Sequence, residues 1–156
     1  MKENLSKSIE ELKRSEHLVY VSLKYTRTGE VFYNIIKRLM SSLEYLINAI
    51  LVDAHESNLI DKIPKSPIKK ADTVLALYKD DQKILRIVEQ FRIFRTLLKS
   101  EYSTKNDFRR HLTAYFVLED GVFEVNIDNI TEMHEEIKAL VFAVQKYLME
   151  KSSADK

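Results

Sequence analysis

The stretch FRTLLKSEYSTKNDFRRHLTAYF, residues 94 to 116, concentrates side chains that could bind phosphate or move a proton. It holds three arginines, two lysines, two tyrosines and one of the four histidines of the chain. Guanidinium and ammonium groups bind phosphate oxygens, and histidine titrates near neutral pH, so this composition is typical of an RNA-handling surface. A solvated basic face without a ligand would have the same composition. The sequence leaves both interpretations open.

Two charged residues lie within apolar helical stripes, where an unpaired buried charge is costly. Arg95 lies between Phe91 and Leu98, and Glu16 lies in a similar stripe near the N-terminus. We therefore expect Arg95 to be mostly buried and bonded to a carboxylate, Glu16 first and Asp53 second. Such a pair could only set the register of two helices, or it could belong to a polar functional site. The candidate residues of that site are Glu16, His17, Arg95, Tyr102 and His111.

Basic residues dominate the middle of the chain. Residues 62 to 111 carry 13 basic and 6 acidic side chains, whereas the whole chain has a net charge of +1. These charges could bind a polyanion, or they could pair with the acidic C-terminal third. The candidate patch consists of Lys62, Lys65, Lys69, Lys70, Lys99, Lys105, Arg109 and Arg110, with His111 beside it. If the two lysine-rich segments lie at opposite ends of the fold, residues 94 to 116 are a solvated seam, and a role in protein interaction is favoured.

The sequence lacks the specific motifs of the common enzyme classes. None of the four histidines has a second histidine at zinc-protease spacing, and there is no glycine-rich phosphate loop or Gly-x-Ser-x-Gly. The absence of cysteine excludes disulfides and thiolate metal sites. We expect no metal, no cofactor and a binding function rather than an enzymatic one.

The elements that position these residues are predicted to be mostly helical. Two glycines and two prolines are too few for a sandwich or barrel with many tight turns. The predicted helices span about residues 4–25, 29–56, 67–78, 81–102 and 130–149. The predicted helix starts are Ser66 followed by Pro67, Asp80 or Asp81, and Asn129 with Glu132 three residues later.

Between the last two helices the apolar period changes from 3.6 to 2, which indicates a β-hairpin around Asp120-Gly121. The predicted pairs are Leu118 with Phe123, Phe116 with Val125, and Ala114 with Ile127, all on one buried face. The fold class is therefore all-α: an up-down bundle of about five helices with one inserted antiparallel hairpin, residues 113 to 127. Residues 1 to 150 form one domain, and residues 151 to 156 form a polar tail.

The environment of the protein is predicted from its apolar segments. The charged N-terminus lacks the apolar core of a signal peptide, and charges interrupt the longest apolar stripe, residues 31 to 54. We therefore expect a cytoplasmic protein without a membrane span. The breadth of the same stripe, and the need of the hairpin for a surface to cover, predict a homodimer.

A long apolar helix, IIKRLMSSLEYLINAILV, is followed by a polar loop and by a helix ending FRIFRTLLKSEYS. Over about residues 10 to 150 this arrangement resembles the HEPN superfamily of prokaryotic nucleotide-binding and RNase domains, and it is similar to small archaeal proteins of that kind. The resemblance implies a dimeric bundle that binds RNA or a nucleotide.

Catalytic members of that superfamily carry an arginine followed, after four to six residues, by a histidine, and this chain has no such pair. Arg95 and Tyr102 have the spacing with tyrosine in place of histidine, and so do five other Arg–Tyr pairs. Tyrosine titrates near about 10 and is a poor acid or base at neutral pH. We therefore predict a non-catalytic HEPN-like protein. The alternatives are a protein interaction module, or a weak metal-independent RNase in which His111 reaches Arg95.

Overall fold

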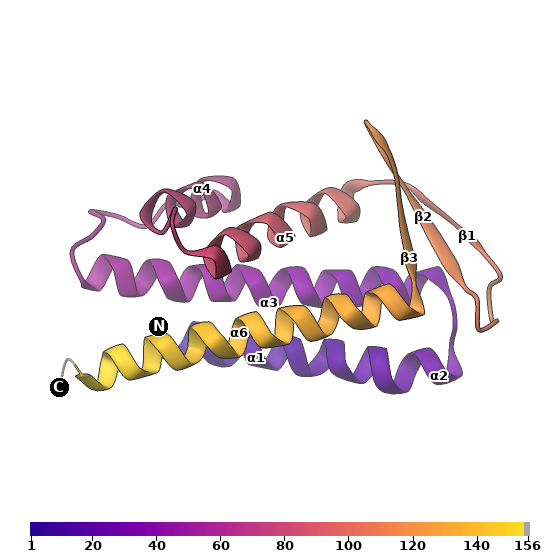
Figure 1. The fold of residues 1–156 in the computed structure, drawn as a ribbon, viewed down its shortest axis with the longest axis horizontal. Helices are drawn as coiled ribbons and strands as arrows, with labels where there is room; N and C mark the ends of the chain where they lie inside the picture. The colour runs from indigo at the N-terminus through magenta and orange to yellow at the C-terminus, as the bar shows by residue number, and fades with distance from the viewer. Residues whose placement is uncertain (155–156) are drawn as a thin grey trace.

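The computed structural model of the protein describes residues 1 to 154 (Figure 1). The helices are α1 (Lys2–His17), the π-helical turn η1 (Leu18–Ser22), α2 (Leu23–Tyr25), α3 (Gly29–Glu56), α4 (Pro67–Leu77), α5 (Gln82–Lys99) and α6 (Ile127–Ala154). The strands are β1 (Tyr102–Lys105), β2 (Thr113–Leu118) and β3 (Gly121–Asn126). The fold is therefore mostly helical, as predicted, but its insertion is a three-stranded sheet and not an isolated hairpin.

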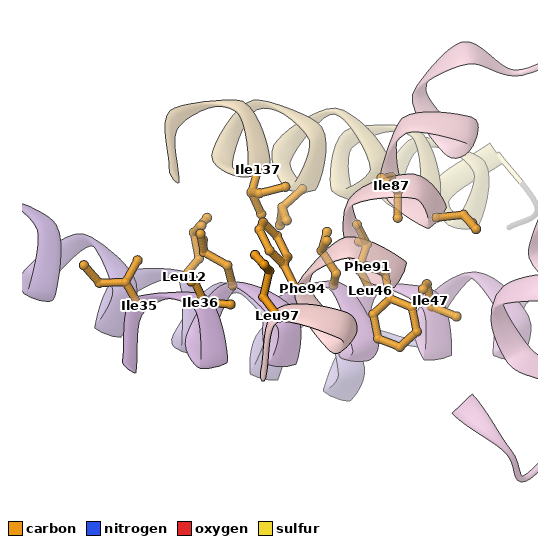
Figure 2. Packing of buried hydrophobic residues seen from close by; sticks show 14 of the residues in the cluster. Leu12, Ile35, Ile36, Leu46, Ile47, Ile87, Phe91, Phe94, Leu97 and Ile137 are labelled. Atoms are coloured by element: carbon orange, nitrogen blue, oxygen red, sulfur yellow. The ribbon is translucent and has the colours of Figure 1, made fainter. Parts of the chain in front are cut away.

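Helix α3 is the centre of the bundle, because α1, α4, α5 and α6 all pack against it. Its buried residues form one broad face, and the opposite face carries partly or fully exposed residues such as Asn34, Lys37 and Arg38. Leu12 of α1, Ile36 of α3, Phe94 of α5 and Ile137 of α6 belong to one continuous core, and Figure 2 shows how these side chains gather between the helices. No helix within residues 1 to 154 is long and apolar enough to span a membrane.

Two of the predicted helix starts are confirmed. The Ser66 hydroxyl accepts a hydrogen bond from the backbone N–H of Lys69, with proline at the first helical position. An Asp81 carboxylate oxygen accepts from the backbone N–H groups of Lys83 (2.9 Å) and Ile84 (3.2 Å). Each cap satisfies backbone donors that have no partner inside the helix.

The ends of the last two long helices differ from the prediction. Helix α5 ends at Lys99, because the residues that follow enter strand β1. Helix α6 starts at Ile127, where the side chains of Asn126 and Asn129 each accept a 2.8 Å hydrogen bond from the other's backbone N–H. Asn126 is therefore the cap, and Asn129 is its reciprocal partner. Helix α6 continues to Ala154, so residues 151 to 154 are helical and not a tail, while residues 155 and 156 lie outside the described part.

The sheet has the order β1-β2-β3, and both pairings are antiparallel. In the hairpin, Phe116 lies opposite Phe123 and Leu118 opposite Gly121, so the predicted register is wrong by two residues. Because side chains alternate with period 2, a shift of two leaves the predicted face buried, including Ala114 and Phe116. Gly121 has a φ of 154°, which favours glycine and moves the turn to the two residues before it.

Strand β1 packs against the first turn of α3 at a very close distance. A Cβ atom added to Gly29 would lie 2.5 Å from Cγ2 of Thr104 and 2.8 Å from Cε2 of Tyr102. Only glycine allows this approach, so the sheet is seated at the N-terminal end of α3. The rise of about 1.5 Å per residue makes this 28-residue helix about 42 Å long, and the loop before α4 lies at its other end (Figure 1).

The contact at Gly29 predicts a specific loss of stability. Gly29→Ala should lower the free energy of unfolding by about 1 to 3 kcal/mol, because the new methyl group overlaps β1 and the sheet must move. Thr28→Ala is the matched control, since the Thr28 side chain makes no capping hydrogen bond. Urea denaturation of both variants measures the difference. Equal stability of the two variants would contradict the close packing of β1 on α3.

Candidate functional site

The predicted ion pair of Arg95 is wrong. Arg95 is half-buried, its guanidinium carbon lies 5.8 Å from the centre of the Phe91 ring, and it forms no ion pair within residues 1 to 154. Glu16 instead accepts a hydrogen bond from Lys138 at 3.1 Å, and Asp53 accepts one from Lys151 at 2.9 Å. The long arginine stem covers apolar surface while its head reaches the edge of the bundle, so it needs no buried carboxylate.

The other predicted members of the polar site are also dispersed. His17 lies on the surface of α1, in a groove beside Arg14. The Tyr102 ring stacks on Phe116 at 5.0 Å between ring centres, and burial raises the pKa of its hydroxyl above the ordinary value. His111 lies in the loop between β1 and β2. The structure does not bring Glu16, His17, Arg95, Tyr102 and His111 together.

The predicted basic patch is divided between the two ends of α3. Lys62 and Lys65 lie in the loop that follows the C-terminal end of this helix, and Lys69 and Lys70 lie in the first turn of α4. The remaining members, Lys99, Lys105, Arg109 and Arg110, lie at or near the sheet. Figure 1 shows the loop before α4 at the C-terminal end of α3 and the sheet with the loop between β1 and β2 at its N-terminal end. A single patch of nine groups therefore does not form.

A cleft of about 460 Å³ lies at the sheet end of the bundle. Its lining residues are Arg27, Arg110, His111, Thr113, Asn126, Ile127 and Asp128. They come from three places in the chain: the connection between α2 and α3, the loop between β1 and β2 with the first residue of β2, and the end of β3 with the start of α6. Two arginines and a histidine face one carboxylate, and neither Arg27 nor Arg110 forms an ion pair within the described residues. The cleft therefore holds an excess of positive charge.

The loop between β1 and β2 is held against the connection before α3. The backbone N–H of Phe108 donates a 2.6 Å hydrogen bond to the carbonyl of Arg27, and Leu112 is fully buried at the other end of the loop. Asn106 and Phe108 adopt φ values of 61° and 65°. The left-handed region is unfavourable for a bulky residue such as phenylalanine, so the surrounding contacts must hold it there.

Two aromatic side chains at this end of the molecule are exposed to solvent. Phe108 is 74% exposed, and Tyr25, two residues before Arg27, is 84% exposed. An exposed phenylalanine in a strained backbone conformation contributes nothing to the core, which makes Phe108 a candidate contact residue. Sequence analysis missed Arg27, Tyr25 and Phe108 as a group, because a count of charges along the chain does not detect residues that folding brings together.

A second polar cluster is buried where the π-helical turn meets α6. The ring of His134 has no exposed surface, its Nδ1 lies 2.8 Å from the Ser15 hydroxyl, and its Nε2 has no partner. The edge of the ring meets Tyr20, whose hydroxyl donates to Glu135. That hydrogen bond, assisted by burial, raises the pKa of Tyr20 to about 12. The cluster is closed to substrates, so we assign it a structural role.

Comparison of the chain with protein-family models, with curated proteins and with solved structures finds no significant match. The resemblance to the HEPN superfamily therefore stays a prediction.

Burial of His134 predicts a decrease in stability in mild acid. Burial lowers the pKa of His134, although Glu135 and Glu16 nearby act in the opposite direction and Lys138 reinforces the decrease. The unfolded chain then binds a proton that the folded protein does not, so the free energy of unfolding should fall as the pH drops below about 6.5. His134→Gln removes this titration and should flatten the change between about pH 7 and 5.5. Urea denaturation across this range measures both slopes, and equal slopes would contradict the assignment.

Proposed function

We propose that this protein is a non-catalytic binding protein that takes RNA or a nucleotide at the cleft beside the sheet. The observation that carries the proposal is the position of Phe108, whose ring is exposed and whose strained backbone donates a hydrogen bond to the carbonyl of Arg27, one of the two arginines that line the cleft. The combination matters because either feature alone is common on protein surfaces.

The chemistry of the cleft suits a nucleotide that is not paired in a duplex. Arginine binds phosphate through two parallel N–H donors, and Arg27 and Arg110 each keep donors that no carboxylate in the described chain occupies. An exposed ring can stack on a base, a contact worth about 1 to 3 kcal/mol in single-strand complexes. Phe108 and Tyr25 are the rings available for stacking. A duplex would hide its bases from both rings, so an unpaired strand is the better ligand.

The absence of an Arg–His pair at catalytic spacing supports binding without cleavage. Tyr102 does not replace the histidine, because burial raises the pKa of its hydroxyl and keeps it protonated at neutral pH. A weak metal-independent RNase is the alternative, and one observation favours it: His111 lines the same cleft as Arg27 and Arg110. His111→Ala should abolish any cleavage of this origin while leaving most binding intact.

The proposal predicts salt-sensitive binding that depends on one end of the molecule. With about three phosphates contacted at the cleft, the affinity for a labelled oligouridylate should fall by at least about 20-fold from 50 to 200 mM salt. Arg109→Glu with Arg110→Glu should remove most of the binding. Lys62→Glu with Lys65→Glu is the matched control, because it makes the same change in charge at the opposite end and should have a small effect. Fluorescence anisotropy measures all three proteins, and circular dichroism checks their folding.

Stacking and charge can be separated in the same assay. Phe108→Ala should weaken binding by about 1 to 3 kcal/mol without changing the salt dependence, because no charge is removed. Phe108→Trp should retain the affinity. No binding by the wild-type protein at 50 mM salt, or equal losses from the two charge-reversal pairs, would exclude the cleft as an RNA site.

A protein interaction module is the second candidate, and the sheet supplies the observation that favours it. Val117 and Val122 lie directly opposite each other on β2 and β3 and are 59% and 60% exposed. The tip of this hairpin extends beyond α5 (Figure 1), and β1 and β3 are edge strands. We take a second copy of the chain as the partner, because paired hairpins would cover each other's valines.

The dimer is tested by molecular mass in solution. Sedimentation equilibrium at micromolar concentration should give twice the 18.4 kDa mass of the chain. Val117→Lys with Val122→Lys should give the monomer, because like charges would face each other across the interface. Leu59→Lys with Ile68→Lys, two comparably exposed residues at the other end of α3, should leave the dimer intact. A monomeric wild-type protein would remove this candidate.

A further inference from the structure

A second basic groove, of about 530 Å³, lies between α1 and α3. Its lining residues are Glu10, Lys13, Arg14, His17, Leu18, Asn34, Lys37 and Arg38. Residues 1 to 61 carry 8 basic and 9 acidic side chains, so the linear sequence shows no positive segment here. Packing of two antiparallel helices collects the cations on one face and leaves most of the acidic residues elsewhere.

A buried carboxylate, that of Glu11, holds the two arginines of the groove in position. The Glu11 side chain is only 10% exposed and accepts hydrogen bonds from Arg14 at 2.8 Å and from Arg38 at 3.0 Å. Arg14 comes from α1 and Arg38 from α3, so Glu11 joins the guanidinium groups of two helices. Arg14 also donates a 3.0 Å hydrogen bond to Glu10. A guanidinium has five N–H donors, so both arginines, which are partly exposed, still have donors that neither Glu10 nor Glu11 uses.

The groove has more positive than negative side chains. Four cationic side chains line it or border it, against the carboxylates of Glu10 and Glu11. Lys13 and Lys37 are exposed and form no ion pair with any residue between 1 and 154. The two arginines are already ordered by Glu11, and the two lysines have no carboxylate partner in the described part of the chain. An anion that binds here therefore does not have to order the guanidinium groups, which favours its binding.

The groove lies near the sheet-end cleft along the helix axis. Asn34 and Arg38 follow Gly29 by five and nine residues, which places them about 8 to 14 Å along α3 from the seat of the sheet. The connection that carries Arg27 joins α2 to the start of α3, so it lies at the same end of α3 as the groove. A mononucleotide occupies one cavity of this size, whereas a strand can reach both.

We infer that the groove between α1 and α3 binds the phosphodiester backbone of an RNA strand whose other nucleotides occupy the sheet-end cleft. The ligand is then an oligonucleotide and not a mononucleotide. The inference rests on the proposed function, since it assigns the remainder of the same ligand. In this arrangement Arg14 and Arg38 hold one phosphate through their remaining donors, and Lys13 and Lys37 neutralise its neighbours.

Charge reversal in the groove tests the inference with two probes, uridine monophosphate and a 12-nucleotide oligouridylate. The variant is Lys13→Glu with Lys37→Glu, and the control is again Lys62→Glu with Lys65→Glu. The groove variant should weaken binding of the 12-mer on the order of tenfold at 50 mM salt and lower the salt slope by about 1.4, for two lost phosphate contacts. Its affinity for uridine monophosphate should equal that of the wild type.

The outcomes separate this inference from the proposed function. If Arg109→Glu with Arg110→Glu weakens both probes but the groove variant behaves like the control, the cleft is an RNA site and the inference is wrong. If the groove variant weakens the monophosphate as much as the 12-mer, the effect is general electrostatics and the inference is also wrong. If the wild type binds neither probe, the proposed function and the inference fail together.

Discussion

Burial of α3 is the constraint on which the rest of the structure depends. Phe32, Ile36, Leu39, Leu43 and Leu46 have no exposed surface, and α1, α4, α5 and α6 all pack against this helix. A helix with so broad an apolar face is stable only when several other helices cover that face. The remaining elements take their positions from this requirement. The sheet closes one end of the helix, and the loop before α4 closes the other.

A pair of buried polar contacts fixes the register of α1 against α3. Ser8 of α1 and Ser42 of α3 each donate a 2.8 Å hydrogen bond to the other's backbone carbonyl within the core. Such a reciprocal pair can form at one register only, because a shift of one residue would leave buried polar groups without partners. One turn further along, the same register brings Arg14 and Arg38 to opposite sides of Glu11. The basic groove is thus a consequence of core packing.

The length of α3 also determines how function is distributed. A rigid helix of about 42 Å separates the lysines near α4 from the arginines of the sheet loop, so they cannot contact one small ligand. The sheet end compensates with residues from distant parts of the chain: Arg27 from before α3, Phe108 and Arg110 from the loop, and Asp128 from α6. The close approach at Gly29 holds these segments together.

The sequence by itself determined the features that depend on near neighbours in the chain. The periodicity of apolar residues located the helices. Ser66 and Asp81 could be recognised from the sequence as capping residues of α4 and α5. The alternation of apolar residues in the hairpin identified its buried face. These interactions reach four residues or fewer along a helix, or across one turn, so local composition specifies them.

Only the tertiary structure decided which charges meet. Glu16 pairs with Lys138 and Arg95 pairs with no acid in the described chain, since long side chains can reach several partners and the packing of whole helices selects among them. Strand β1 could not be predicted, because four polar residues form a strand only when β2 is beside them. The sheet-end cleft and the groove between α1 and α3 have the same origin. The cations of each come from separate parts of the chain, and the packing around α3 brings them together.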